Sequence, residues 1–473
     1  MAPRSLKLYV KLAAAACVQI AIQFTYSIAF SLTGPLFSQQ FRMKSAGVNV
    51  IFSLIGPLIG FFVQPIMGAV GDRCTFKFGR RRIFLLIGMI IDIIGTICIC
   101  LSSYIDEAFY GMDASESGSD SIENHIVGVV LGITGIFIAF FGVNIMQAPS
   151  RAIVSDIFDA ENQQDANLMI NAFCGLASIC CFLISAFMTE SDAFNLYTVM
   201  FGLCACVVVI ATIPTLLFAK EKRYVPEEGS KTSIAQPFID LFQAIKMIRL
   251  DIVFILLSLM LGWFAYQPLS TNFTVFVQKE IFPEIHEDEG LQMAMFMMTV
   301  FAAVQFVSVI IFPFITSVIG EITTFLVFQG LAAVSYAMII VINFTFPEEI
   351  DSDESKPAYY SSIALGFISV VFPAMAFVQT NSLPYSMLKK VVPEERYGAF
   401  VGLLNCAVVI AQFLCSGLIS LIQIGIDSYL VGFVIAFIAA LLCCGGSVVL
   451  YFVKTTDGSA GEKQKLVENA EAN

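Results

Sequence analysis

The chain has 473 residues, of which 58% are hydrophobic and 13% are charged, whereas an ordinary soluble domain is about a quarter charged. This composition excludes a soluble globular protein. The net charge of −12 also argues against a nucleic-acid partner, because proteins bind phosphate backbones through positively charged surfaces.

Crossing a bilayer takes about 20 apolar residues, and runs of this length alternate with short polar segments along the chain. Lipid offers no hydrogen-bond partner to open backbone groups, so these runs should be helices. The first run is longer than the roughly 7–15 apolar residues of a signal peptide, and we interpret it as the first span. We therefore expect an all-α membrane protein with twelve transmembrane helices, at residues 8–36, 47–71, 83–104, 125–149, 166–189, 194–219, 251–278, 291–316, 322–346, 358–388, 398–422 and 428–453.

The basic residues predict how these spans are oriented in the membrane. An even number of crossings places both termini on one side, and that side carries 21 of the 25 lysines and arginines. Because cytoplasmic loops are enriched in Lys and Arg, we expect both termini in the cytoplasm. We expect the plasma membrane as the host membrane, with a vacuolar or endolysosomal membrane as the alternative.

Internal similarity indicates that the chain is a duplicated unit. Aligning Pro149 with Pro384 places Asn144 opposite Gln379. Two repeated halves, each with a fourth helix interrupted by proline, are typical of an alternating-access transporter that binds its substrate between the halves near the midplane. We expect an N-terminal six-helix half at 1–219, a cytoplasmic central loop at 220–250, a C-terminal six-helix half at 251–454 and a cytoplasmic tail at 455–473.

The segment between the second and third spans reads GAVGDRCTFKFGRRR, residues 68–82. Its glycines permit close helix approach, and its charged residues can pair across the cytoplasmic ends of the helices. The simpler alternative is that this segment serves only as a signal for orientation. The pattern is more specific than a basic cluster, so we expect a cytoplasmic gate formed by Gly68, Asp72, Arg73, Gly79, Arg80, Arg81 and Arg82.

Polar and aromatic side chains form stripes on four of the expected spans. Amides offer both donors and acceptors to a neutral ligand rich in hydroxyl groups, and aromatic faces suit its apolar side. Hydrogen bonding between helices is the alternative for each stripe taken alone. The candidate binding residues are Gln19, Gln23 and Tyr26 in the first span, Asn144, Gln147 and Arg151 in the fourth, Tyr266 and Gln267 in the seventh, and Gln379, Asn381 and Tyr385 in the tenth.

Two acids are candidates for proton coupling. Asp92 lies midway along the third span, and an acid at that depth is a functional hypothesis by default. Asp156 follows the fourth span. A structural pairing is the alternative for Asp92. We find neither a metal-binding pattern nor a set of nucleophile and base, so we expect no enzyme, no metal and no cofactor beyond a proton gradient.

Four segments resemble the sucrose-transporter branch of the glycoside–pentoside–hexuronide transporters. The resemblance spans both halves and implies the major facilitator fold and transport of a disaccharide or glucoside, usually together with a proton. The segments are GFFVQPIMGAVGDRCTFKFGRRRIFLL (60–86), QAPSRAIVSDIFDAENQQ (147–164), WFA (263–265) and SLPYSMLKKVVPEERYGAFVGLLNCAVVIAQ (382–412).

The chain departs from this family at positions that bear on proton coupling. The resemblance implies an acid in the fourth span at the position of Phe140, and another acid in the seventh span at the position of Asn272. We expect a monomeric carrier in the lipid bilayer that transports sucrose or a related sugar as a proton symporter. The alternatives are an uncoupled sugar facilitator and a carrier of an organic acid or other solute.

Overall fold

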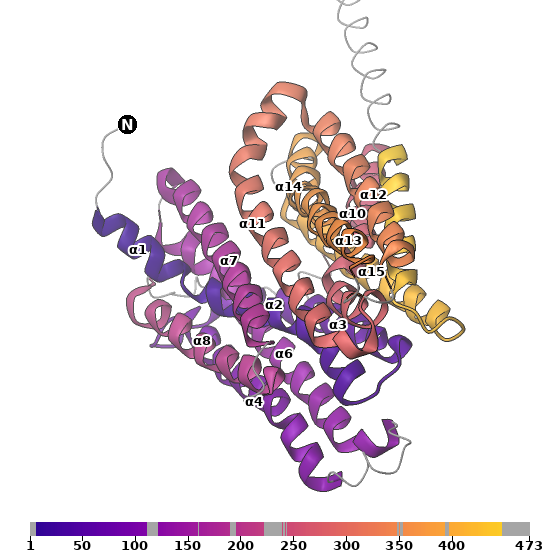
Figure 1. The fold of residues 1–473 in the computed structure, drawn as a ribbon. Helices are drawn as coiled ribbons and strands as arrows, with labels where there is room; N and C mark the ends of the chain where they lie inside the picture. The colour runs from indigo at the N-terminus through magenta and orange to yellow at the C-terminus, as the bar shows by residue number, and fades with distance from the viewer. Residues whose placement is uncertain are drawn as a thin grey trace, which may run out of the picture.

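The computed structural model describes residues 6–110, 122–158, 160–189, 195–221, 244–347, 353–392 and 397–446 as continuous stretches, together with a few single residues between them. Within these ranges every regular element is a helix, and the helices form one bundle (Figure 1). The expectation of an all-α protein is confirmed. The expected central loop and tail lie largely outside the described residues, and the boundaries of the halves stay a prediction.

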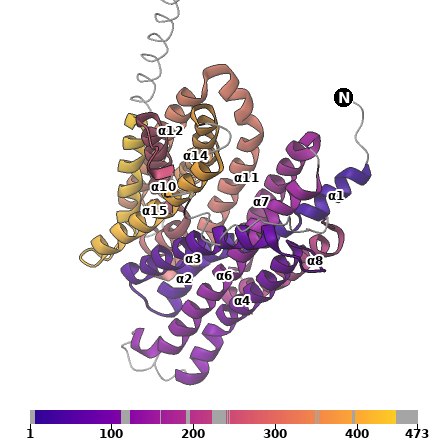
Figure 2. The same ribbon diagram turned by 180° about the vertical axis from the view of Figure 1, so that it is seen from behind.

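The helices fall into two groups that lie side by side in both views (Figures 1 and 2). The first group contains α1 (Leu6–Ala16), α2 (Val18–Pro35), the π-helical turn η1 (Leu36–Gln40), α3 (Ser45–Arg73), α4 (Arg82–Tyr110), η2 (Ile122–His125), α6 (Ile126–Ile157), α7 (Ala160–Met188) and α8 (Leu196–Phe218). The second group contains α10 (Leu250–Phe276), η3 (Val277–Ile281), η4 (Glu284–His286), α11 (Glu287–Ile319), α12 (Glu321–Thr345), α13 (Lys356–Ser369), α14 (Val371–Val391), α15 (Tyr397–Gln423) and the helix Leu430–Gly446.

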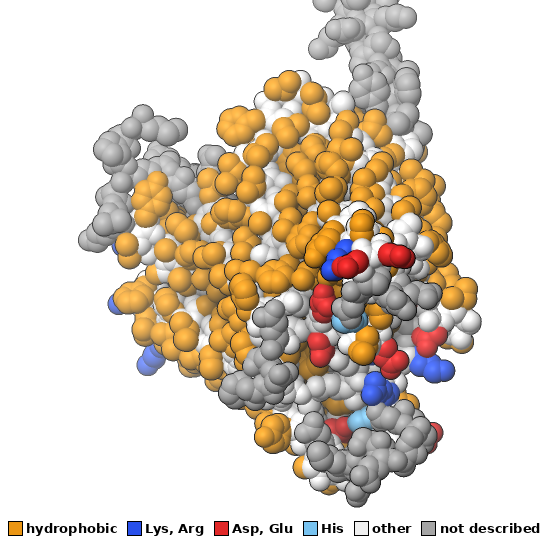
Figure 3. All heavy atoms as spheres, in the orientation of Figure 1, with side chains coloured by type: hydrophobic (Ala, Val, Ile, Leu, Met, Phe, Trp, Pro, Cys, Tyr) orange, Lys and Arg blue, Asp and Glu red, His pale blue; other side chains and the backbone are white. Residues whose placement is uncertain are grey.

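The described helices agree with the expected spans. Eleven helical segments are long and apolar enough to cross a membrane, and the helix Leu430–Gly446 matches the first part of the expected twelfth span. The expected first span is divided into α1 and α2 at Cys17, and the tenth is divided into α13 and α14 at Val370. Hydrophobic side chains cover most of the flank of both groups (Figure 3), which suits helices surrounded by lipid.

The prediction that proline interrupts the fourth helix of each half is wrong. Helix α6 continues through Pro149, and α14 continues through Pro384. Neighbouring helices and Ser side chains can stabilise the backbone around a proline in a membrane helix, and Ser150 Oγ donates to the carbonyl of Gln147 at 2.7 Å beside Pro149. The tenth span instead breaks at Val370, well before its proline.

The two ends of the bundle differ in charge and in contacts. We call the end with Arg80–Arg82 the arginine end, and the end with Glu284–Glu289 the acidic end. At the acidic end Ser45 Oγ donates to Asp427 at 2.6 Å, and Asn49 Nδ2 donates to Gln423 at 2.9 Å. These bonds join α3 of the first group to the second group. At the arginine end α7 and α11 diverge (Figures 1 and 2).

Candidate functional site

A cluster of four polar side chains joins α2, α3 and α6 inside the first group. The Gln64 amide nitrogen donates to Asn144 Oδ1 and to Gln147 Oε1, both at 2.7 Å. The Tyr26 hydroxyl donates to Gln147 Oε1 at 3.1 Å. Asn144 and Gln147 are three positions apart, so α6 presents both on one face. We call Tyr26, Gln64, Asn144 and Gln147 the amide cluster.

Aromatic rings form an apolar wall beside the amide cluster. The ring of Phe140 meets the ring of Tyr26 edge-on with centroids 5.5 Å apart, and meets Phe30 at 5.6 Å. Phe140 is buried, and its side chain lies close to Gly56 on α3. The cluster thus combines amide groups with an aromatic face, which is the combination that a sugar requires.

Arg151 lies one turn beyond Gln147 on α6, and its side chain is exposed. Its positive charge acts on the Tyr26 hydroxyl and on the Cys174 thiol, so it lies near both α2 and α7. A cation at this depth is favourable only where it faces water or a partner. The structure thus places Arg151 next to the amide cluster with its side chain accessible.

The two glutamines of the first span lie on α2 and bind other helices of the first group. The Gln19 amide donates to Ser150 Oγ at 2.8 Å, and the Gln23 amide donates to Ser178 Oγ at 3.0 Å. Gln19 is buried, whereas Gln23 is half-buried. These contacts correspond to the alternative of hydrogen bonding between helices.

The second group contributes an aromatic stack from α10 and α14. The ring of Tyr266 stacks on Phe377 with centroids 3.6 Å apart, and Trp263 meets the same phenylalanine edge-on at 5.2 Å. Gln267 is buried, and its amide lies 3.5 Å from Ser416 Oγ on α15. The predicted residue Tyr266 and its neighbour Trp263 therefore face the tenth span.

The polar residues of α14 have three different surroundings. Gln379 is buried, and neither polar atom of its side chain has a hydrogen-bond partner within the described ranges. Asn381 is exposed, and its amide donates to the carbonyl of Phe377 at 2.9 Å. The Tyr385 hydroxyl donates to Asn405 Oδ1 at 2.9 Å. Gln379 is thus the α14 side chain with unused hydrogen-bonding capacity.

The acid Asp156 and two predicted gate arginines form one charged cluster at the arginine end. Arg80 Nη2 lies 2.6 Å from Asp156 Oδ1, and Arg81 Nε lies 3.2 Å from Asp156 Oδ2. The backbone amides of Arg81 and Arg82 donate to the Glu221 carboxylate at distances between 2.9 and 3.1 Å. Glu221, just after α8, is buried and was not identified from the sequence. We call Arg80, Arg81, Asp156 and Glu221 the arginine-end cluster.

The remaining gate residues differ in what the structure describes. Gly79 has φ +136°, which favours glycine, and a Cβ there would lie 2.8 Å from Arg82 Nε. A Cβ on Gly68 would meet no atom within 4 Å. Asp72 and Arg73 belong to α3, but their side chains lie outside the described residues. Arg82 donates to the carbonyl of Leu216 at 2.9 Å and lies over the Phe78 ring.

Asp92 lies within α4, and its side chain is fully buried. Its Oδ2 accepts from the Thr25 hydroxyl at 3.0 Å, while Oδ1 has no hydrogen-bond partner among the residues that the structure describes. Asn272 on α10 is also fully buried, and both polar atoms of its amide lack partners. Such groups are rare in folded proteins because an unpaired buried polar atom is destabilising.

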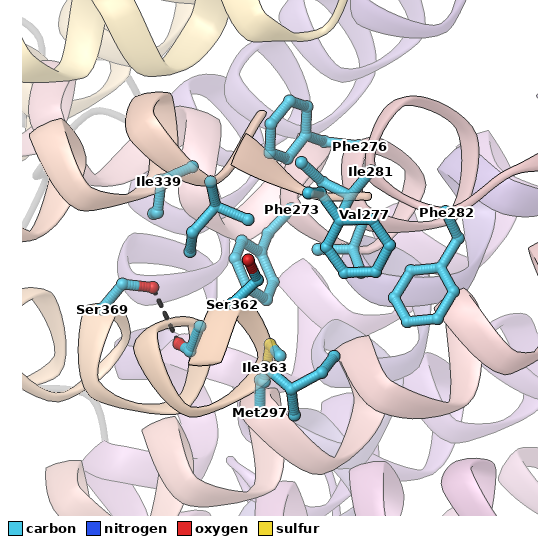
Figure 4. Close-up of a pocket in the computed structure, with 13 residues that line it drawn as sticks. Phe273, Phe276, Val277, Ile281, Phe282, Met297, Ile339, Ser362, Ile363 and Ser369 are labelled. Carbon is cyan, nitrogen blue, oxygen red and sulfur yellow. Dashed lines mark hydrogen bonds between the residues drawn. The ribbon is translucent and has the colours of Figure 1, made fainter. Parts of the chain in front are cut away.

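A separate pocket lies within the second group and is lined mainly by phenylalanine and aliphatic side chains from α10, η3, α11, α12 and α13 (Figure 4). Two serines reach it, and the Ser369 hydroxyl donates to the carbonyl of Gly366 at 2.7 Å. This lining offers few polar groups to a ligand rich in hydroxyls, so the amide cluster remains the better candidate for a sugar site.

Comparison with known proteins places these features in a family. The profile of the Major Facilitator Superfamily matches residues 15–416. "Sucrose transport protein SUT5" of Oryza sativa subsp. indica is 26% identical over 440 residues, which cover 85% of this chain and 80% of the relative. "Proton-associated sugar transporter A" of Rattus norvegicus is 27% identical over 231 residues, which cover 48% of this chain and 29% of the relative. The resemblance to sucrose carriers is confirmed.

Solved structures with the same fold are transporters of several kinds. The nucleoside transporter NupG has a TM-score of 0.64 at 14% identity, and the match covers 93% of this chain and 99% of the NupG chain. A D-xylose-proton symporter has a TM-score of 0.57 at 15% identity, and the match covers 92% of this chain and 97% of the symporter chain. The expectation of a transporter rather than an enzyme is confirmed, and the chain belongs to the Major Facilitator Superfamily.

Proposed function

We propose that the protein transports sucrose, or a related disaccharide or glucoside, by alternating access. The observation that carries this proposal is the amide cluster beside an aromatic wall. Each amide in the cluster can exchange a hydrogen bond with its neighbour for one with a sugar hydroxyl, and the rings of Tyr26 and Phe140 can cover the apolar face of a sugar ring. Similarity to sucrose transport proteins over 85% of the chain supports the same substrate class.

The contacts between the two helix groups support alternating access. Ser45, Asn49 and Gln39 of the first group bind Asp427, Gln423 and Gln278 of the second at the acidic end. With the termini in the cytoplasm, as the basic residues predict, this arrangement corresponds to a carrier that is closed outside and open inside. The proposed units are the halves 1–219 and 251–454, and the proposed state is a monomer in the plasma membrane.

A second candidate function is transport of an organic acid. The observation that favours it is the exposed guanidinium of Arg151 beside the amide cluster, because Arg binds carboxylates through paired hydrogen bonds. Competition separates the two candidates. Unlabelled maltose should reduce transport of labelled sucrose if the substrate is a sugar, whereas only organic acids should compete in the alternative.

Counterflow of labelled sucrose into proteoliposomes that contain the purified full chain tests the proposal. We expect counterflow in the wild type and about a tenfold weaker apparent affinity in Asn144→Ala, which corresponds to one lost hydrogen bond. Asn195→Ala is the matched control. Asn195 caps α8 at the acidic end, where its side chain accepts from the amides of Tyr197 and Thr198. A wild type that exchanges neither sucrose nor maltose would refute the proposed substrate class.

A further inference from the structure

Asp92 is an acid that the described helices bury away from both ends of the bundle. Its side chain is 0% exposed, and among the described residues it forms no ion pair. From the part of the chain that the structure describes, one hydrogen bond, donated by Thr25, reaches its carboxyl group, and none reaches Oδ1. An ionised carboxylate with one hydrogen bond and no cation is costly at this depth in a membrane protein. The site therefore favours the protonated acid in this conformation.

The helices around Asp92 supply polar but uncharged neighbours. On α2 the nearest are Thr25 and Tyr26, and on α8 Cys204 Sγ lies 3.4 Å from the Thr25 hydroxyl. On α6 the facing residue is Gly142, where a Cβ would lie 2.4 Å from the Asp92 nitrogen. Arg151 is the nearby cation, and its charge acts on Tyr26. The described groups that face Asp92 thus provide no compensating charge in direct contact.

Thr25 can form a hydrogen bond with Asp92 whether the acid is ionised or protonated. Its hydroxyl oxygen lies 3.0 Å from Asp92 Oδ2 and 3.1 Å from the carbonyl of Ala21, yet a hydroxyl has only one hydrogen to donate. When Asp92 is ionised, the Thr25 hydrogen points to the carboxylate. When Asp92 is protonated, the acid donates to Thr25, and Thr25 donates to Ala21. Both states are hydrogen-bonded without movement of heavy atoms.

This site is adjacent to the amide cluster. Thr25 precedes Tyr26 on α2, and Tyr26 donates to Gln147 on α6. When Asp92 is ionised, its charge acts on Tyr26, as does the opposite charge of Arg151. A change of charge at Asp92 therefore alters the balance of electrostatic forces on a residue of the amide cluster.

We propose that Asp92, with Thr25 as its hydrogen-bond partner, is the proton-binding site that couples proton entry to sugar transport. This inference rests on the proposed function. In the coupled step the carboxylate takes one proton from water on the side of entry, which forms the O–H bond of the acid, and returns that proton to water on the other side. The sugar is unchanged.

Two measurements on the full chain in proteoliposomes test this proposal. The first is the ratio of sucrose uptake driven by an inward proton gradient to sucrose counterflow without a gradient. We expect accumulation in the wild type, up to about tenfold per pH unit for one proton per sugar, and a ratio near one in Asp92→Asn. Glu284→Gln, at an exposed position of the acidic end, is the control, and it should keep the response to the gradient.

The second measurement is infrared difference spectroscopy of the purified protein between high and low pH. We expect a C=O band of a protonated carboxylic acid that is lost in Asp92→Asn and shifted in Thr25→Val, which removes the hydrogen bond but keeps the acid. Thr25→Val also keeps the proposal testable if Asp92→Asn fails to fold.

Three results would overturn the proposal. They are a wild type whose sucrose uptake ignores the gradient, an Asp92→Asn protein that still accumulates sucrose, and a carboxylic band unaffected by either variant. Sucrose counterflow without a response to the gradient would refute only the role of Asp92. Absence of counterflow with an intact Asp92 band would instead refute the proposed sugar substrate.

Discussion

The third and fourth helices of the two groups pack together by different means. In the first group α4 and α6 approach until their backbones touch, and a Cβ on Gly95 would lie 2.2 Å from the Ala139 nitrogen. In the second group α12 and α14 are joined by side chains, and the Gln329 amide donates to Thr380 Oγ1 at 2.8 Å. Glycine lets membrane helices approach closely, and amides join them by hydrogen bonds. A repeated topology therefore does not require repeated packing chemistry.

The charged residues at the arginine end also differ between the helix pair α4 and α6 and the helix pair α12 and α14. In the first group the arginines precede α4, and the acid Asp156 lies at the end of α6. In the second group Glu321 begins α12, and Lys390 lies near the end of α14, with 2.7 Å between their charged atoms. The ion pair is present in both groups with its polarity reversed.

The helix dipole explains how the two arrangements differ in stability. A helix favours an acid at its N-terminus and a base at its C-terminus, which is the arrangement of Glu321 and Lys390. The arginines before α4 oppose the dipole. The buried Glu221 carboxylate offsets this effect, because it accepts the backbone amides of Arg81 and Arg82 at the start of α4.

The largest effect should come from widening the α4–α6 contact. Gly95→Ala forces a Cβ against the backbone of α6, where no flexible side chain can move away. We expect destabilisation above about 3 kcal/mol, beyond ordinary overpacking, seen as loss of the monodisperse peak in fluorescence size-exclusion chromatography. Gly330→Ala is the control, because a Cβ there lies 3.8 Å from Cys444 Sγ. A stable Gly95→Ala protein would contradict the described contact.

A smaller effect should follow from removing the charge that caps α4. Glu221→Gln removes a buried carboxylate that lies 4.0 Å from Arg80 Nε and accepts the backbone amides of Arg81 and Arg82. We expect a loss of about 2–3 kcal/mol in the free energy of unfolding, near the lower end of the range for breaking a buried pair. The measurement is the thermal midpoint in detergent. Glu284→Gln, at an exposed position of the acidic end, should leave the midpoint unchanged. Equal midpoints for both variants would show that Glu221 does not stabilise α4.

The smallest effect should come from the second ion pair. The Lys390 side chain is 58% exposed, and exposed ion pairs contribute less than about 1 kcal/mol. Lys390→Ala should therefore lower the thermal midpoint less than Glu221→Gln does in the same detergent. The Ser386 hydroxyl, which donates to Glu321 at 2.6 Å, keeps one partner for the acid. A decrease in the thermal midpoint as large as that of Glu221→Gln would show that the two ion pairs stabilise their helix groups equally.

Part of the candidate site could be predicted from the sequence. The spacing of Asn144 and Gln147 places them on one helix face, and both lie in the amide cluster with Tyr26. Gln64 was missed, although an amide within the apolar second span was a usable signal. Gln19 and Gln23 occur in an equally regular stripe, yet they bind Ser150 and Ser178. Periodicity gives the face of a helix but not the neighbour that the face meets.

The sequence by itself determined the fold class and the position of the spans, because apolar length and backbone hydrogen bonding in lipid are local properties of each segment. Only the tertiary structure decided which polar groups meet. Gln64 and Asn144 are 80 positions apart, and Thr25 and Asp92 are 67 positions apart. Such pairs depend on how each helix is rotated and packed against the others, which is a property of the whole bundle.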